Sequence, residues 1–213
     1  AELDFSFPVG RIEPMFLGPM TFEEFLLAMD EQGLIKFLQN YTLAKKIPIE
    51  FHNKLLSYTR KHMMFGGMPE IVKTYSETQN LAECHRIQQG LLDSYLNDFH
   101  KYRKKVPYER LHKLFTKIPT MIGHRFKYSF VDRQERSKAL AVALDLLCHA
   151  RVAYKVRHSS ANGVPLAAQA SDQPFKIILL DVGIMSLLLG ISLHELEQDK
   201  PSIVSSMQGR LAE

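Results

Sequence analysis

The chain has 213 residues, of which 46% are hydrophobic and 23% are charged, a composition that excludes a disordered, collagenous or coiled-coil protein. Its formal net charge of +4 is too small by itself to indicate nucleic acid or an anionic membrane as a partner. Two cysteines, Cys84 and Cys148, are too few for a disulfide framework, which favours a reducing cytoplasm. The longest apolar run, residues 177–191, is too short to span a membrane, so no membrane role is expected.

Charge is distributed unevenly along the chain. Residues 1–50 carry four basic and eight acidic side chains, whereas residues 101–138 carry twelve basic and three acidic ones, a net charge of 12 − 3 = +9. Any anionic partner is therefore expected to contact the middle of the chain.

The first half of the chain has the periodicity of a helical protein. Thr21 and Glu24 form a capping-box pattern, and Asn80 with Glu83 marks a second helix start. Pro69 is suited to a first helical turn, where its missing N–H has no intrahelical acceptor. Helices are predicted over residues 22–29, 34–39, 48–64, 69–75 and 81–102.

The second half, which we divide from the first at Val106-Pro107, has a different order of elements. Two helices flank a linker that contains Tyr128-Ser129-Phe130, and two strands flank a polar loop over residues 158–173. This order is typical of a winged helix, so the predicted fold class is mainly α with a small β-hairpin. Helices are predicted over residues 107–122, 133–150 and 182–189, with another after Ser192, and strands over residues 152–156 and 175–180.

Several enzyme motifs are absent from the sequence. No G-x-x-x-x-G-K-[ST] loop occurs, so the chain alone cannot be a P-loop enzyme. G-x-S-x-G and H-E-x-x-H are absent as well, and the nine histidines show no metal-ligand spacing. No metal site is predicted.

Three segments in order suggest a family. They are Ser6-Phe7-Pro8-Val9-Gly10-Arg11-Ile12-Glu13, then Gly18-Pro19-Met20-Thr21-Phe22-Glu23-Glu24-Phe25-Leu26, then Gly66-Gly67-Met68-Pro69-Glu70. Together with Phe126-Lys127-Tyr128-Ser129 and residues 175–183, this order closely resembles prokaryotic AAA-type ATPases with a C-terminal domain of unknown function.

The resemblance implies that the chain is an excerpt of a longer ATP-binding protein. Residues 1–20 would end the ATPase core, residues 21–105 would form its helical lid, and residues 106–213 would form the winged-helix domain. The P-loop and the ligands of ATP and magnesium would lie upstream, and a nuclease-like module would lie downstream. The excerpt alone would have no ATPase activity, and in the full-length protein nucleotide hydrolysis would drive domain movement.

The resemblance also assigns roles to two sites. It places Arg11 near the nucleotide phosphates as a catalytic residue, in cis or across a subunit contact of a homo-oligomer; the alternative is a surface ion pair with Glu13. It places Gly67, Met68 and Pro69 near the adenine as cofactor-binding residues; the alternative is a plain helix break.

A different class of function rests on the basic middle of the chain. A winged helix commonly inserts its second motif helix into the major groove of DNA. The sequence places Arg133, Arg136 and Lys138 at the start of that helix, and Arg125 and Lys127 in the turn before it. These five residues are the candidate nucleic-acid contacts of a DNA-binding regulator. The predicted wing has no Lys or Arg, and a winged helix that serves only domain packing, or a protein-interaction module without a ligand, stays open.

Overall fold

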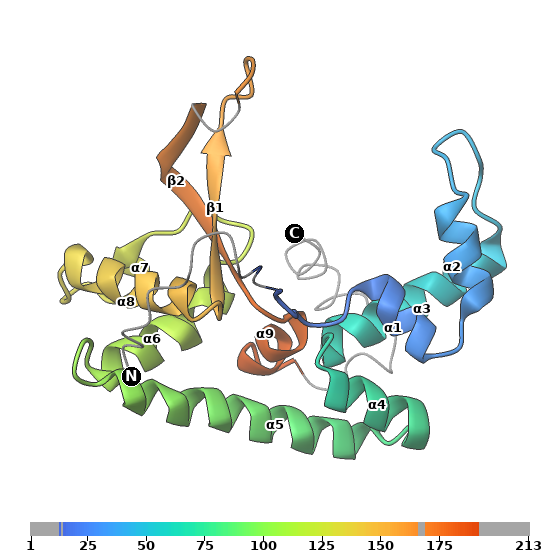
Figure 1. Ribbon diagram of the computed structural model, residues 1–213, viewed down its shortest axis with the longest axis horizontal. Helices are drawn as coiled ribbons and strands as arrows, with labels where there is room; N and C mark the ends of the chain where they lie inside the picture. Colours follow the sequence, from blue (N-terminus) through green and yellow to red (C-terminus); the bar gives the residue numbers. More distant parts are fainter. Residues whose placement is uncertain (1–12, 14, 166–168, 192–213) are drawn as a thin grey trace.

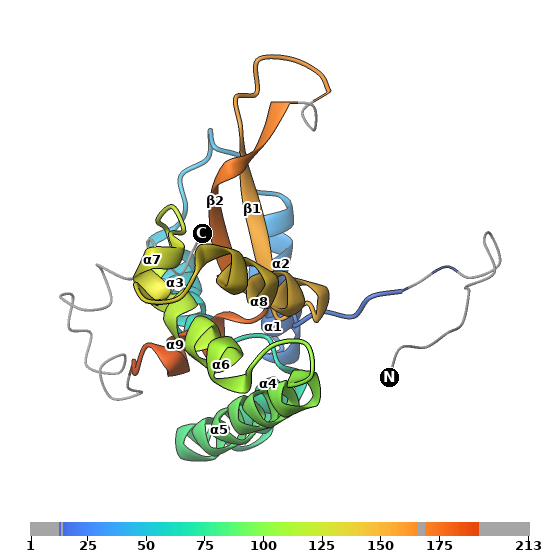
Figure 2. The ribbon, with the colours of Figure 1, turned by 90° about the vertical axis from the view of Figure 1, so that its left-hand side faces the viewer.

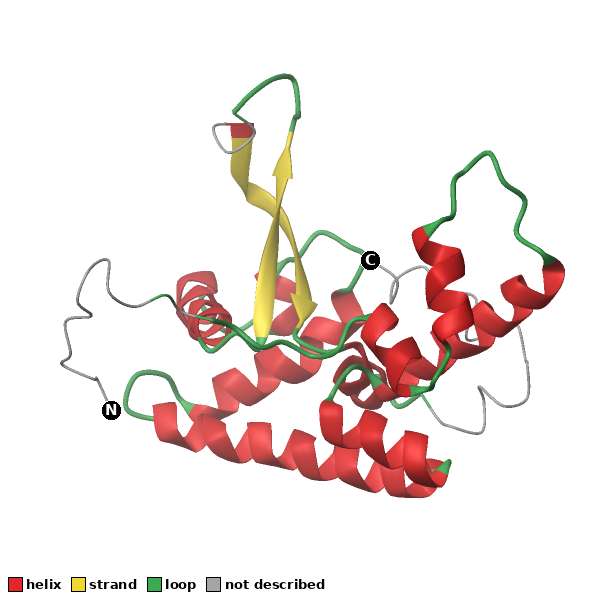
Figure 3. Cartoon of the chain, turned by 45° about the vertical axis from the view of Figure 1, so that its right-hand side comes forward, coloured by secondary structure: helices red, strands yellow, loops and turns green. Residues whose placement is uncertain are grey.

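The computed structural model describes residues 13, 15–165 and 169–191. In this part the chain is mainly helical with one two-stranded antiparallel hairpin, which confirms the predicted fold class. Figures 1 and 3 show the hairpin rising between helices at both ends, with the longest helix running along the base. No helix in the described ranges has the length and apolar character needed to cross a membrane. The elements of the first half are α1 (Phe22–Ala28), α2 (Gln32–Gln39), α3 (Ile49–Phe65), α4 (Pro69–Thr78) and α5 (Leu81–Asp98), which continues into the 3₁₀ turn η1 (Phe99–Tyr102).

The second half repeats the predicted order but differs in several element bounds, and the helix predicted after Ser192 lies outside the described residues. A short helix forms where only a linker is predicted, and the two strands are longer than predicted, so part of residues 158–173 is strand. Figure 2 shows that the hairpin projects well beyond the helices. The elements are α6 (Tyr108–Lys117), the 3₁₀ turn η2 (Ile118–Met121), α7 (Tyr128–Val131), α8 (Ser137–His149), β1 (Ala153–Ser159), β2 (Ala170–Leu179) and α9 (Val182–Leu188).

The predicted helix caps are confirmed. The Thr21 amide donates to Glu24 Oε2 at 2.7 Å, and the Glu24 amide donates to Thr21 Oγ1 at 3.3 Å, which completes the capping box. Asn80 Oδ1 accepts from the Glu83 amide at the start of α5. Each bond satisfies a backbone N–H that has no intrahelical acceptor.

Two hydrophobic clusters hold the helices together. The smaller one joins α3, α4 and α5 around Phe65, Ile71 and Cys84. The larger one joins α6, α8, the hairpin and α9, and it also contains Leu92 and Phe99 from α5 and the turn after it. Helix α5 therefore contributes to both clusters, and the division of the chain at Pro107 stays a prediction.

A buried junction, made by the Gly66-Gly67 turn and the Asp181 start of α9, links the two halves. The carboxylate of Asp181 accepts from the Gly67 amide at 2.7 Å and from the Ile184 amide at 3.0 Å. The Gly67 amide follows the end of α3 and the Ile184 amide lies in the first turn of α9. A single side chain thus satisfies a donor 114 residues away and a donor of the helix that it caps.

Small residues are required at this junction because backbones touch. A Cβ atom added at Gly67 would lie 2.1 Å from the Met20 carbonyl oxygen, and one added at Gly183 would lie 2.4 Å from the Phe65 backbone. Gly66 has a φ of +72° and faces the Asp181 carboxylate, so both its conformation and its surroundings exclude a larger residue. The free carbonyls at the end of α3 are satisfied by Gln88 Nε2 on Met64 and by Ser186 Oγ on Met63.

Candidate nucleic-acid interface

Helices α6, α7 and α8 followed by the β1–β2 hairpin have the connectivity of a winged helix. Leu111 and Leu114 of α6 and Leu140 and Leu144 of α8 are fully buried in the larger cluster, so the apolar stripes of the two long helices face one core. The outer face of α8 is left to solvent. This arrangement fixes the turn over residues 132–136, which connects α7 to α8, at one end of the molecule.

Two ion pairs tie that turn to α6. Glu135 receives two bonds from Arg110, at 2.8 and 3.2 Å, and Asp132 pairs with Lys113. The Lys113 ammonium and the Gln134 amide hold the pKa of Asp132 below its usual value, which keeps this carboxylate ionised. Both acidic side chains of the turn therefore form ion pairs with residues of α6.

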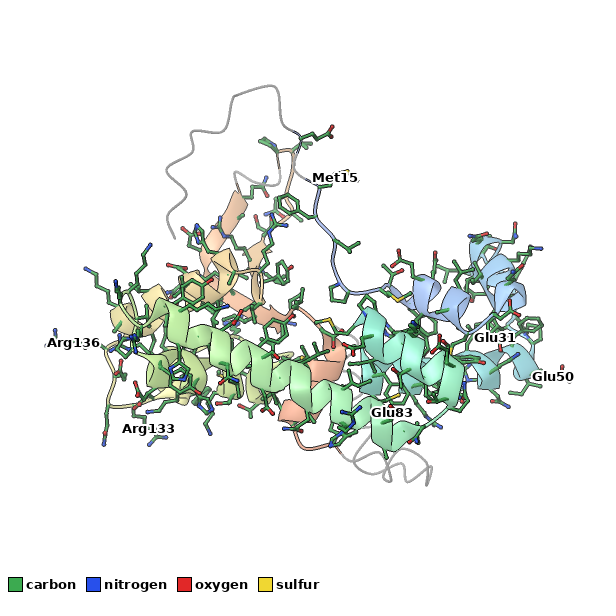
Figure 4. The ribbon with its side chains drawn as sticks, turned by 60° about the horizontal axis from the view of Figure 1, so that its bottom comes forward. Met15, Glu31, Glu50, Glu83, Arg133 and Arg136 are labelled. Carbon is green, nitrogen blue, oxygen red and sulfur yellow. The ribbon has the colours of Figure 1, made fainter. Side chains whose placement is uncertain are left out.

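The two arginines of the same turn are exposed. Arg133 and Arg136 form no ion pair with any described residue, and Figure 4 shows them at the opposite end of the molecule from Glu31 and Glu50. The prediction that they begin the recognition helix is wrong, because α8 starts only at Ser137. Arg136 has extended backbone dihedrals (φ −68°, ψ 128°), and Asp132 Oδ1 accepts from the Gln134 amide, which stabilises a turn instead of a helix.

The other three predicted contacts meet in one groove. Arg125 and Lys127 precede α7, Lys138 lies in the first turn of α8, and all three line a groove of about 780 Å³. The base of the wing closes the groove with Phe175, which stacks on Phe126 at a ring distance of 5.6 Å. The bond from the Phe126 amide to the Phe175 carbonyl, 2.9 Å long, fixes this wall. The groove is thus lined by cations and aromatic rings.

The start of α8 adds positive potential to this surface. Its N-cap residue, Arg136, makes no side-chain cap, and its first turn contains no acidic residue. The first N–H groups of a helix carry partial positive charge, so this helix end adds to the field of the three cations.

The wing contributes little free charge. Lys155 of β1 pairs with Asp145 of α8, and Arg157 pairs with Asp172 across the hairpin at 3.4 Å. Burial alone would lower the pKa of Lys155, but the Asp145 carboxylate raises it above its usual value, so the pair stays charged. Lys155 and Arg157, which sequence reasoning did not single out, are therefore each paired with an acidic residue of the chain itself.

The described residues among those assigned to nucleotide contact lie elsewhere. Arg11 is outside the described residues. Gly67 lies in the buried junction, Met68 packs against both hydrophobic clusters, and Pro69 occupies the first turn of α4. Each of these three has a local structural reason, and none of them contacts the basic groove.

The junction contains titratable groups that the sequence did not single out. Burial raises the pKa of Asp181, and hydrogen bonds from Gly67 and Ile184 partly offset this rise. Burial also lowers the pKa of His62, whose Nε2 lies 3.3 Å from the Met20 carbonyl. Both residues line a small cavity of about 270 Å³ with Pro19, Met20 and Met185. The only sequence signal for Asp181 is an acidic residue in front of an apolar helix.

The sequence matches one known domain family. A family model matches residues 56–195, which is more than half of the chain. The chain belongs to DUF8612, a domain family of unknown function. The DUF8612 match runs from within α3 past the end of α9, so it contains the junction and the basic groove but not α1 or α2. No curated protein and no solved structure matches the chain.

This result corrects the resemblance to AAA-type ATPases. The chain matches a DUF8612 domain and no AAA or ATP-binding family, so the family assignment drawn from the ordered Gly-, Pro- and Phe-containing segments is wrong. Local structure accounts for much of the Gly66-Gly67-Met68-Pro69 segment on which the resemblance partly rested. Gly67 contacts the Met20 backbone, Gly66 contacts the Asp181 carboxylate, and Pro69 begins α4. The nucleotide roles of Arg11 and of Gly67 to Pro69 depended on that resemblance.

Proposed function

We propose that the chain binds double-stranded DNA through the basic surface formed by Arg125, Lys127, Arg133, Arg136 and Lys138. The observation that carries this proposal is the separation of charge in the α7–α8 turn. The carboxylates of Asp132 and Glu135 are bound to α6, while the neighbouring arginines are exposed. Three more basic residues line the groove, together with Ser137, which directly follows Arg136. None of these five cations pairs with a carboxylate among the residues that the structure describes, which makes them suited to phosphate contact.

Salt dependence tests the proposal directly. Each phosphate contact releases condensed counterions, so five contacts predict a slope of about −4 in log K against log salt concentration. Fluorescence anisotropy of a labelled 20-base-pair duplex between 50 and 200 mM salt measures this slope. A duplex that stays unbound at 50 mM salt would contradict the proposal.

A charge-matched pair of variants separates a local effect from a general one. Arg133→Ala with Arg136→Ala is expected to weaken binding by about 10- to 100-fold and to reduce the magnitude of the salt slope by about 2. Lys36→Ala with Lys73→Ala removes the same charge from exposed positions on α2 and α4 and is expected to change affinity less than threefold. Equal losses in both variants would show that net charge, and not this surface, accounts for binding.

A further inference from the structure

The outer face of α8 shows which part of DNA this surface can contact. The exposed stripe of the helix consists of Lys138, Val142, Asp145 and His149, spaced so that they follow one another along one side. In a winged helix this is the side that would face the base edges. Its chemistry can therefore be compared with what base recognition requires.

The stripe offers almost no hydrogen bonds to bases. Val142 is 52% exposed and has no polar side-chain atom, and Asp145 is paired with Lys155. His149 lies at the far end of α8, where its Nδ1 is 3.2 Å from the Asp145 carbonyl. The bidentate pairs from Arg, Lys, Asn or Gln give the strongest discrimination between bases, and only Lys138 among these types lies on the stripe.

Four of the five cations lie beside the helix, and only Lys138, in its first turn, lies on it. Arg133 and Arg136 belong to the turn before α8, and Arg125 and Lys127 belong to the segment before α7. Lys155 and Arg157 of the wing are paired with acidic residues of the chain itself. Positive charge is thus concentrated where a duplex presents phosphates, and it is absent from the middle of the recognition helix.

We infer that this surface binds the sugar-phosphate backbone of duplex DNA without reading its sequence. The inference rests on the proposed function and specifies the ligand for that same site: any duplex of sufficient length, with no preferred motif. The α8 stripe then disfavours close approach of the helix to the bases, because Asp145 adds a carboxylate to the face that would enter the groove.

Selection from a random pool tests this directly. The intact chain is incubated at 50 mM salt with duplexes that carry a randomised 16-base-pair centre, and the bound fraction is sequenced after several rounds. No enriched motif is expected, and AT-rich, GC-rich and scrambled competitors are expected to displace a labelled duplex within threefold of one another. An enriched motif that competes more than tenfold better than scrambled DNA would overturn the inference while leaving DNA binding intact.

Substitutions on the α8 stripe test whether its residues read the base sequence. Val142→Ala and His149→Ala alter the stripe and are expected to change affinity by less than threefold for every duplex, whereas Arg133→Ala with Arg136→Ala weakens all of them equally. A loss confined to one sequence in the stripe variants would overturn the inference. If wild-type chain binds none of the pool, the proposed function itself fails. Far-ultraviolet circular dichroism of each variant confirms that the fold is retained.

Discussion

The junction around Asp181 and the turn before α8 both contain acidic residues, yet they are built in opposite ways. In the junction every side chain has a partner: Asp181 is 3% exposed and binds two amides, Gln88 and Ser186 bind carbonyls of α3, and glycines allow the backbones to touch. In the turn the acidic residues are paired and the arginines are exposed. The first arrangement stabilises the fold, and the second leaves charge available to a ligand. An unusual motif is thus weaker evidence of function than a charged group without a partner.

The largest effect should come from adding one methyl group to the junction. Gly67→Ala and Gly183→Ala would each place a Cβ atom inside the contact distance of backbone atoms, which cannot move away as a side chain could. Each is expected to lower the free energy of unfolding by about 3 kcal/mol or more, measured by urea denaturation.

Helix α5 supplies the matched control for this substitution. Gly90 lies inside the helix with no atom within 4 Å of an added Cβ. Gly90→Ala is expected to raise the free energy of unfolding by about 0.5–1 kcal/mol, because alanine favours the helix over glycine. If the junction variants lost no more stability than this control, the close backbone contact would not be what determines the choice of glycine.

Removing the Asp181 carboxylate is expected to have the next largest effect. Asp181→Ala leaves the Gly67 and Ile184 amides buried without acceptors, so the free energy of unfolding should fall by about 2–4 kcal/mol. Asp181→Asn keeps an amide oxygen that can accept one of the two bonds, and a smaller loss is expected. Equal losses in the two variants would show that the charged carboxylate, and neither side-chain volume nor a single retained acceptor, dominates this position.

The ion pair between Arg110 and Glu135 connects fold and function at the turn. Arg110→Gln should lower the free energy of unfolding by about 1 kcal/mol, because the pair is bidentate and about 70% buried on both sides. It also leaves the Glu135 carboxylate unpaired beside Arg133 and Arg136, so DNA affinity should fall severalfold although no proposed contact is changed. The exposed pair of Lys101 with Asp98 is the control: Lys101→Gln should alter neither quantity. Unchanged DNA affinity in Arg110→Gln would show that the turn does not need this pair to present its arginines.

The sequence predicted the helices, their caps and the hairpin because those features depend on local patterns. Thr21 with Glu24 is a pattern three residues apart, and the structure confirms it. The start of α8 was placed four residues early because the ion pairs that hold the turn join residues 19 and 25 positions apart, and no local pattern records them. The role of Asp181 was missed for the same reason, since its partner Gly67 is 114 residues away. The five basic residues could be listed from the sequence, but only the structure shows that Asp132 and Glu135 form ion pairs with α6 instead of with these residues.

The smallest expected effect is a change in how stability depends on pH. Burial lowers the pKa of His62 below its ordinary value of 6.5, so between these two values the unfolded chain binds more protons than the folded one. His62 alone therefore makes the free energy of unfolding fall as the pH drops below about 6.5. The raised pKa of Asp181 acts in the opposite direction, because above its ordinary value of 3.8 the folded chain holds its proton longer.

His62→Gln removes the first contribution and keeps a group that can donate to Met20, so the variant should lose less stability than the wild type between pH 6.5 and 5, measured by urea denaturation at each pH. His52→Gln, on the exposed side of α3, controls for the substitution itself. If His62→Gln lost as much unfolding free energy between pH 6.5 and 5 as the wild type, proton uptake by His62 would not contribute to stability. The junction would then differ from the exposed basic surface in its hydrogen bonds alone.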